Sequence, residues 1–272
     1  VLQEFLRREI RRMTGEAAVR LNKYSEVRES IYGKHVRSSD MLLTGLIYGC
    51  TAVSLLILVG ILGYTFVRGI PHVTWSFLST ASSAVKGTFG ILGNIINTIY
   101  IVVITLLIAT PIGVGSAVYL NEYAKPGKIV RMIEFTTETL SGIPSIIFGL
   151  FGMVFFGNTI GLGYSILTGS LTLTLMILPL ITRTTQEALK TVPDSYRHGA
   201  LGIGATKWYM IRTILLPSAM PGIVTGVILA IGRIVGESAA LLFTAGSGYY
   251  LPKNILGKIF ESGGTLTIQL YL

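Results

Sequence analysis

The sequence predicts an all-α membrane protein, a polytopic bundle of helices that cross the bilayer several times. Hydrophobic residues make up 51% of the 272 positions and charged residues only 13%, about half the charged share of a soluble domain. Uncharged stretches recur along the chain, and several exceed the roughly 20 residues that a helix needs to cross the hydrocarbon core. The basic residues gather between these stretches on alternate sides, which is the pattern of membrane topology.

The uncharged stretches define the predicted spans in order. A continuous stretch over residues 139–182 is too long for one crossing, and glycines near 157–164 divide it into two spans. Pro144 predicts a kink or a helix start inside it, because proline lacks an N–H and restricts the preceding residue. We expect a sixth span beyond Leu272. The five predicted spans are 41–67, 94–120, 140–156, 165–182 and 220–243.

Basic residues orient these spans. Nine Lys/Arg lie in residues 1–40, three in 121–139 and five in 183–219. The segments on the opposite side hold four, which are Arg68, Lys86, Lys253 and Lys258. The positive-inside rule therefore predicts a basic cytoplasmic N-terminal segment over 1–40, a transmembrane domain over 41–272, and a cytoplasmic loop at 183–219. On this interpretation the net charge of +9 reflects contact with membrane lipid and not with nucleic acid.

Small residues recur at four-residue spacing within the predicted spans. Gly113 precedes Ala117, and Gly222 precedes Gly226. Residues four apart share one helix face, and small side chains there let two helix backbones approach closely. We interpret both pairs as close helix packing and assign them no further function.

The loop at 183–219 carries a motif. Its spacing predicts two short helices on either side of a turn at Gly204, a knob suited to docking on a soluble partner. The loop resembles the EAA loop of ABC importer permeases, whose pattern is E-A-A-x3-G-x9-I-x-L-P. Here His198-Gly199-Ala200 takes the place of E-A-A, with histidine instead of glutamate. Gly204, Ile214, Leu216 and Pro217 fall at the required offsets.

Four segments narrow the resemblance to the PstA family of phosphate permeases. They are SGIPSIIFG at 141–149, VPDSYR at 192–197, LGIGATKW at 201–208 and GRIVGESAALLFT at 232–244. The resemblance runs from about residue 41 to the end of the chain. It implies a bundle of the ABC importer permease type that carries inorganic phosphate across the bacterial cytoplasmic (inner) membrane.

The resemblance also implies partners. These are a second permease like PstC, an ATPase dimer like PstB that binds ATP and Mg, and an extracytoplasmic phosphate-binding protein like PstS. The 183–219 loop would supply the coupling helix that sits on the ATPase. The residues expected to carry this contact are His198, Gly199, Ala200, Gly204, Ala205, Thr206, Lys207, Trp208, Ile214, Leu216 and Pro217.

Signatures of catalysis are not found in the sequence. A phosphate-binding loop needs G-x-x-x-x-G-K-[ST] after a strand, and GIGATK at 202–207 lacks that ending. His35, His72 and His198 do not have metal-ligand spacing. We therefore predict a transporter subunit that is not an enzyme and holds no cofactor, and whose energy comes from the partner ATPase.

Two charges fall within the fifth predicted span. An ionised side chain at the centre of a membrane costs at least about 2.5 kcal/mol on insertion scales, so Arg233 and Glu237 must face protein, water or a ligand. They lie four apart and so share one helix face, where they could pair with each other or be satisfied by a neighbouring helix. The guanidinium fork also matches phosphate oxygens. Glu237 could hold Arg233 in position, or accept a hydrogen bond from hydrogen phosphate and repel sulfate; the sequence leaves both open.

Other charges flank the spans. Arg183 ends the fourth span, and it is either a positive-inside anchor or, as the resemblance implies, a second phosphate contact. We interpret Glu134 and Glu138 as solvated acids at a helix start. Two alternatives to the phosphate permease remain from the residues themselves. One is an importer permease for another solute such as sulfate or molybdate, and the other is a membrane anchor or regulator without a transport path.

Overall fold

The computed structural model describes residues 38–83, 87–251, 254 and 257–272. The chain divides into two units, residues 1–72 and 73–272, and each is described by itself. The basic N-terminal segment predicted for residues 1–40 lies outside the described residues, except for its last three positions.

The first unit holds one long helix, α2 (Ser38–Gly69), which is followed by the short 3-10 helix η1 (Ile70–His72). Asp40 and Arg68 stand near its two ends, and the residues between them are uncharged. Its 32 residues span about 48 Å at 1.5 Å per residue, which exceeds the roughly 30 Å of a hydrocarbon core. Residues 39–72 are long and apolar enough to cross a membrane, which confirms the first predicted span.

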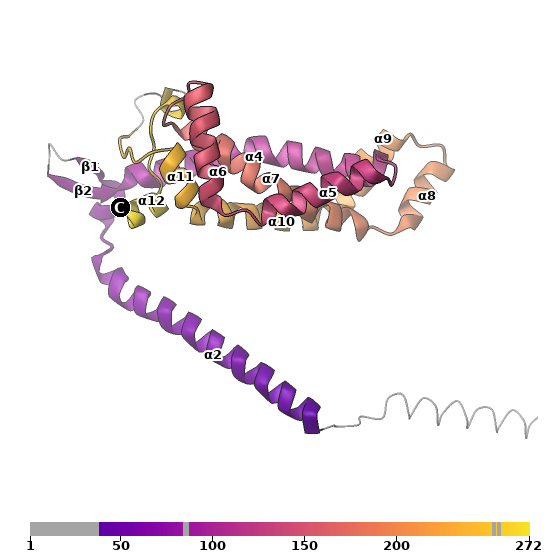
Figure 1. Cartoon of the computed structure of the whole chain (residues 1–272), viewed down its shortest axis with the longest axis horizontal. Coiled ribbons are helices and arrows are strands. Elements are labelled where there is room, and N and C mark those ends of the chain that lie inside the picture. The colour runs from indigo at the N-terminus through magenta and orange to yellow at the C-terminus, as the bar shows by residue number, and fades with distance from the viewer. Residues whose placement is uncertain (1–37, 84–86, 252–253, 255–256) are drawn as a thin grey trace, which may run out of the picture. The chain divides into compact units, whose positions relative to one another are not determined.

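Helices make up most of the second unit (Figure 1). A small antiparallel hairpin precedes the long helices, with Ala81 opposite Ile91 and Ser83 opposite Thr88. The elements are α3 (Trp75–Ser79), β1 (Ala81–Ser83), β2 (Thr88–Ile91), α4 (Leu92–Val118), the π-helical turn η2 (Tyr119–Tyr123), α5 (Lys128–Ser141), α6 (Ser145–Gly152), the π-helical η3 (Met153–Thr159), α7 (Ile166–Lys190), α8 (Asp194–Gly202), α9 (Lys207–Met210), the π-helical η4 (Ile211–Leu215), α10 (Leu216–Gly236), α11 (Ala239–Thr244), the 3-10 helix η5 (Gly257–Phe260) and α12 (Leu266–Tyr271).

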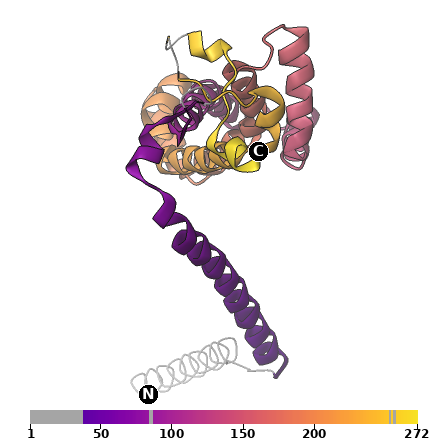
Figure 2. The same ribbon diagram turned by 90° about the vertical axis from the view of Figure 1, so that its left-hand side faces the viewer.

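Helix α7 is central to this unit. It contacts α4, α10, α5, α6 and α11; Figure 2 shows the helices of this unit nearly end-on. Glycines bring the backbones together: Gly113 of α4 packs directly on α7. On the other side, Gly222 of α10 faces Ala188. One turn further on, Gly226 faces Thr184. The close packing predicted from the small-residue spacing is therefore confirmed.

Three further helical stretches of the described chain are long and apolar enough to cross a membrane: Leu92–Tyr123, Ile166–Lys190 and Lys207–Gly236. The first contains the predicted span 94–120, the second contains all but the first residue of 165–182, and the third contains most of 220–243. The pair α5 and α6–η3 adds a fifth crossing if its two arms count as one broken span.

Two predicted spans differ from the structure. The third, expected over 140–156, is one arm of a pair bent by 100°. The bend falls where Pro144 has an extended backbone, with φ −57° and ψ 138°, so the break predicted at this proline is confirmed. The fifth, expected over 220–243, ends at Gly236, because Glu237 is extended (φ −81°, ψ 126°) and α11 begins only at Ala239.

The two ends of the second unit are built from different elements. Helices α8 and α9 lie at one end, and the hairpin, α11 and α12 lie at the other (Figure 1). At the hairpin end, buried Asn94 of α4 donates hydrogen bonds to the carbonyls of Gly264 and Thr265, at 3.1 and 3.4 Å. Buried Asn97 donates to the carbonyl of Gly248 at 3.0 Å. Hydrogen bonds from these two side-chain amides thus hold the segment after α11 against the first turns of α4.

Candidate functional site

The predicted knob is present as helix, turn and helix. Helix α8 ends in a turn at Gly204, whose φ of +84° favours glycine. The Ala205 N–H donates to the carbonyl of Ala200 at 3.0 Å. Thr206 then caps α9, because its hydroxyl accepts the N–H of Tyr209 at 3.3 Å. We call residues 191–210 the α8–α9 knob.

The knob is shorter than the predicted loop at 183–219. Residues 183–190 continue α7 to its end at Lys190. From Lys207 onward the chain is again helical and runs through η4 into α10. Both flanks of the loop are therefore helical extensions of the spans, and only the α8–α9 knob departs from the bundle.

The residues predicted to couple the chain to an ATPase divide by exposure. Ala200 is buried, as are Met210 and Ile211, which lie within the motif between Gly204 and Ile214. Ile214 and Leu216 are half-buried, and Pro217 stands exposed in the first turn of α10. Large apolar side chains remain uncovered, with Ile203 86% and Trp208 61% exposed. The other exposed positions of the motif are His198, Gly199, Gly204, Thr206 and Lys207.

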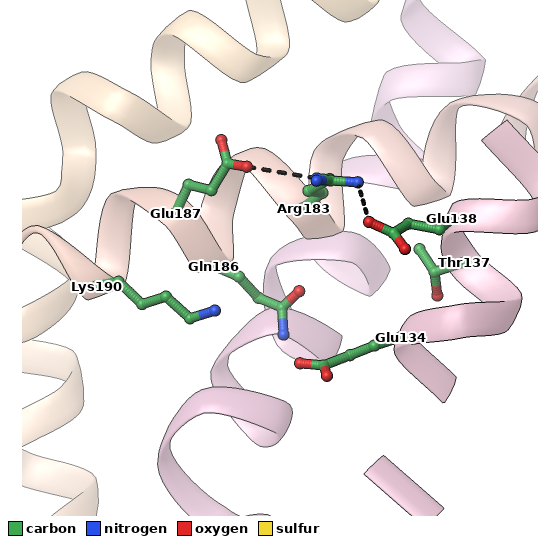
Figure 3. A pocket seen from close by; sticks show the side chains of 7 residues that line it. All are labelled: Glu134, Thr137, Glu138, Arg183, Gln186, Glu187 and Lys190. Carbon is green, nitrogen blue, oxygen red and sulfur yellow. Dashed lines mark hydrogen bonds and ion pairs between the residues drawn. The ribbon is translucent and has the colours of Figure 1, made fainter. Parts of the chain in front are cut away.

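Arg183 lies on α7 between two carboxylates (Figure 3). Its Nη1 donates to Oε1 of Glu138 on α5 at 2.7 Å, and its Nε donates to Oε1 of Glu187 at 3.4 Å. All three side chains are exposed. An exposed ion pair contributes only about 0–1 kcal/mol, so this accessible charged group adds little to the stability of the fold. The surrounding pocket of about 270 Å³ is lined by Glu134, Thr137, Glu138, Arg183, Gln186, Glu187 and Lys190.

Glu138 is a site residue that sequence reasoning missed. We interpret it with Glu134 as an acid at a helix start, but Glu134 lies in the middle of α5 and Glu138 in its last turn. The partner of Glu138 is 45 residues away, and no local pattern reports such a contact. The bond between Arg183 and Glu187 has i,i+4 spacing, which is the kind of pair that a sequence does reveal.

Arg233 lies near the C-terminal end of α10, on the packed side of the helix. It is seven residues, or about two turns, beyond Gly226, which meets α7. The residue is half-buried. Within the described part of the chain its guanidinium makes no hydrogen bond or ion pair. Arg233 thus presents an uncommitted cation near a packed helix face.

Glu237 does not pair with Arg233. The two were expected to share a helix face, but Glu237 lies past the end of α10 on extended backbone. Its Oε1 accepts the N–H of Ala240 at 3.0 Å, which caps the start of α11. Its carbonyl accepts the hydroxyl of Thr267 at 2.7 Å. The carboxylate therefore supports the break between two helices, and the intrahelical pair that the spacing left open does not form because the helix ends first.

The charged residues occupy separate places. Arg183 faces α5 through Glu138, whereas Arg233 and Glu237 belong to the end of α10. Gly222 opposite Ala188 and Gly226 opposite Thr184 show that α10 runs antiparallel to α7. The same register, continued along α10, brings Arg233 level with residue 177, one to two turns before Arg183. Within the described residues no bond joins Arg183 to Arg233.

Several long apolar helices, a bent helix pair and a knob between two spans define the chain as a multi-pass helical membrane protein of the permease type. The comparison with protein families agrees: residues 109–272 match the family described as binding-protein-dependent transport system inner membrane component. The chain belongs to this family, and it is a permease subunit of an ABC-type importer.

Individual relatives cover most of the chain. It is 43% identical to the probable ABC transporter permease protein YqgI of Bacillus subtilis, over 76% of the chain and 71% of the relative. It is 35% identical to the phosphate transport system permease protein PstA of Haemophilus influenzae, over 80% of the chain and 77% of the relative. A solved structure of the MetNI methionine ABC transporter in an inward-facing conformation matches 58% of this chain and 75% of its own, at 25% identity and a TM-score of 0.47.

Proposed function

We propose that the chain is the phosphate-translocating membrane subunit of its importer, with Arg233 as the principal substrate contact. The observation that carries the proposal is the uncommitted guanidinium of Arg233 on the packed side of α10. A cation kept in an apolar span without a protein partner needs a compensating anion. Guanidinium offers phosphate two parallel hydrogen bonds. The similarity to PstA of Haemophilus influenzae favours phosphate as that anion.

The local backbone supports a substrate path at this place. Arg233 stands one turn before the break at Glu237 and Ser238. Discontinuous helices in transporters line binding sites, because their free backbone groups face a cavity. Arg183 is the second candidate contact. Its bond to Glu138 is exposed, so an arriving phosphate could replace the carboxylate at the guanidinium.

The remaining assignments follow from the same proposal. The α8–α9 knob docks on an ATPase dimer like PstB, which binds ATP and Mg, and a second permease like PstC completes the path. A binding protein like PstS delivers phosphate from outside. The basic segment 1–40 and the knob then face the cytoplasm. The exposed apolar side chains of Ile203 and Trp208 fit a protein contact at the knob.

Uptake of labelled phosphate and sulfate into cells that lack the native subunit tests the proposal. Arg233→Gln should abolish phosphate uptake while the ATPase still co-purifies with the complex. Arg131→Gln, which alters an exposed arginine of α5, is the matched control and should transport normally. Uptake of sulfate without phosphate by the unaltered chain would assign another cargo, and full phosphate uptake by Arg233→Gln would reduce Arg233 to a structural role.

A further inference from the structure

One guanidinium joins the knob to two other helices. Arg197 of α8 donates from Nε and Nη2 to Oε1 of Glu122, at 3.3 and 3.0 Å. Its Nη2 also donates to the carbonyl of Leu189 at the end of α7, at 3.0 Å. Its Nη1 donates to the carbonyl of Val192 at 2.9 Å and to Oδ1 of Asp194 at 3.0 Å. Arg197 therefore links α8, the end of α7 and the turn η2 that prolongs α4.

The bond between Arg197 and Glu122 is shielded from solvent. The side chains are only 17% and 6% exposed, whereas Asp194 is 81% exposed. A buried ion pair is weak evidence for stability, because desolvation offsets the attraction, but it fixes one arrangement of the groups that it joins. Only arginine presents enough donors in a fixed fork to satisfy these acceptors together.

A second contact reaches the neighbouring residue of the same turn. Lys207, the first residue of α9, places Nζ 5.0 Å from the ring centroid of Tyr123, within the range of a cation–π interaction. The two helices of the knob thus hold two consecutive residues of η2. We call Glu122 and Tyr123 the knob seat.

Apolar packing under the knob is separate from the core of the bundle. Its buried members come from α4, α7, the knob, η4 and α10, so the knob and the adjoining helix ends form one packed group. These residues are Val118, Ala188, Leu189, Val192, Ala200, Met210, Ile211, Leu215, Ala219 and Ile223. Both α4 and α10 adopt a π-helical turn where they join this group, at η2 and η4. Such turns are frequent at functional places in helices.

The order of the helices along the chain makes the knob seat the link between the knob and α4. Helix α7 leads into the knob and α10 leaves it, so both are tied to it by the chain itself. Helix α4 has no such link in sequence. It must follow the knob through packing and through the bonds at Glu122 and Tyr123. We propose that Arg197 is a positioning residue that makes α4 move with the knob, so that motion of the ATPase reaches α4 through the knob seat. This inference rests on the proposed docking of the knob on an ATPase.

Transport coupling in the assembled complex tests the inference. The complex with its ATPase and binding protein is reconstituted in proteoliposomes, and phosphate delivered per ATP hydrolysed is measured. Glu122→Gln and Arg197→Gln should keep the ATPase bound and hydrolysing, while the ratio falls about fivefold or more, the lower end of couplings between sites. Asp194→Asn neutralises only the exposed partner of Arg197 and should leave the ratio unchanged. A purely stabilising role would instead lower the yield of complex and leave the ratio of the surviving complex intact.

A distance measurement separates this inference from the choice of cargo. Spin labels are placed at Ile112 of α4 and Ser195 of the knob, both exposed and neither assigned to the ATPase contact, after the free cysteine Cys50 is replaced by serine. With the knob seat intact, the distance distribution should stay narrow when a non-hydrolysable ATP analogue is added to the complex. In Glu122→Gln it should broaden or shift. An unchanged distribution together with an unchanged ratio would overturn the inference, even if phosphate proves to be the cargo. If the importer carries another solute, the distance distribution still tests whether α4 moves with the knob.

Discussion

We predict that Gly222→Ala destabilises the chain although alanine favours helices. Gly222 of α10 faces α7, and a β-carbon at position 222 would lie 2.5 Å from the β-carbon of Ala188. This is about 1 Å inside the optimal separation of two carbon atoms. The β-carbon of Ala188 is fixed to its backbone, so a rotamer change cannot relieve the overlap. The two helices must move apart.

The expected magnitude follows from two opposing effects. Overpacking costs about 1–3 kcal/mol, and replacing glycine by alanine inside a helix returns about 1 kcal/mol. Gly232 of the same helix is the matched control, because the space around its β-position is open. Gly232→Ala should therefore be neutral or more stable by up to about 1 kcal/mol. The two variants should differ by about 1–3 kcal/mol in the free energy of unfolding.

The measurement is an SDS titration of the purified full chain in detergent micelles, followed by circular dichroism. Ala188→Gly removes the β-carbon that a side chain at position 222 would overlap. Gly222→Ala and Ala188→Gly together should therefore show a favourable coupling of about 1–3 kcal/mol in a double-mutant cycle. Equal stability of Gly222→Ala and Gly232→Ala, or strict additivity with Ala188→Gly, would refute the packing argument.

Three further predictions concern separate features. Glu237→Ala should lower the free energy of unfolding by about 0.5–2 kcal/mol in the same titration, since the cap on the Ala240 N–H is lost. Glu237→Gln keeps an acceptor and should retain most of the lost stability. Equal stability of the two variants would contradict the cap. Asn94→Ala should cost about 1–3 kcal/mol, because the buried carbonyls of Gly264 and Thr265 lose a donor; unchanged hydrogen exchange in α12 would speak against it. Gly204→Ala should cost about 1–2 kcal/mol at its left-handed backbone and should speed amide exchange in the knob. Gly202→Ala, at an open helical position, should not speed this exchange. Similar exchange rates in both variants would show that the turn tolerates a side chain.

Features that depend on local sequence were predictable. Uncharged length alone located the spans at 41–67, 94–120 and 165–182, because crossing a bilayer requires continuous apolar sequence. The break at Pro144 and the turn at Gly204 follow from the backbone restrictions of single residues. The small pair at Gly222 and Gly226 has helical spacing, which indicated a packed face before the partner helix was known.

Features that depend on distant contacts were not predictable. Glu237 appeared to continue a helix, and only its bonds to Ala240 and Thr267 explain why α10 stops before it. Residues that pair across the fold, such as Arg183 with Glu138, carry no spacing signal. Of the candidate phosphate contacts, Arg233 could be named from its place in an apolar span, but only the structure shows that the described residues offer its guanidinium no hydrogen bond or ion pair.

The bent pair of α5 and α6 has a consequence for biosynthesis. Neither arm alone, at about 1.5 Å per residue, reaches across a bilayer of roughly 30 Å, so neither arm forms a complete span by itself. Gly149 on α6 lies directly against the backbone of Ala240 on α11, a helix synthesised much later. Packing of α6 in this region is therefore completed only after the residues around Ala240 have been synthesised.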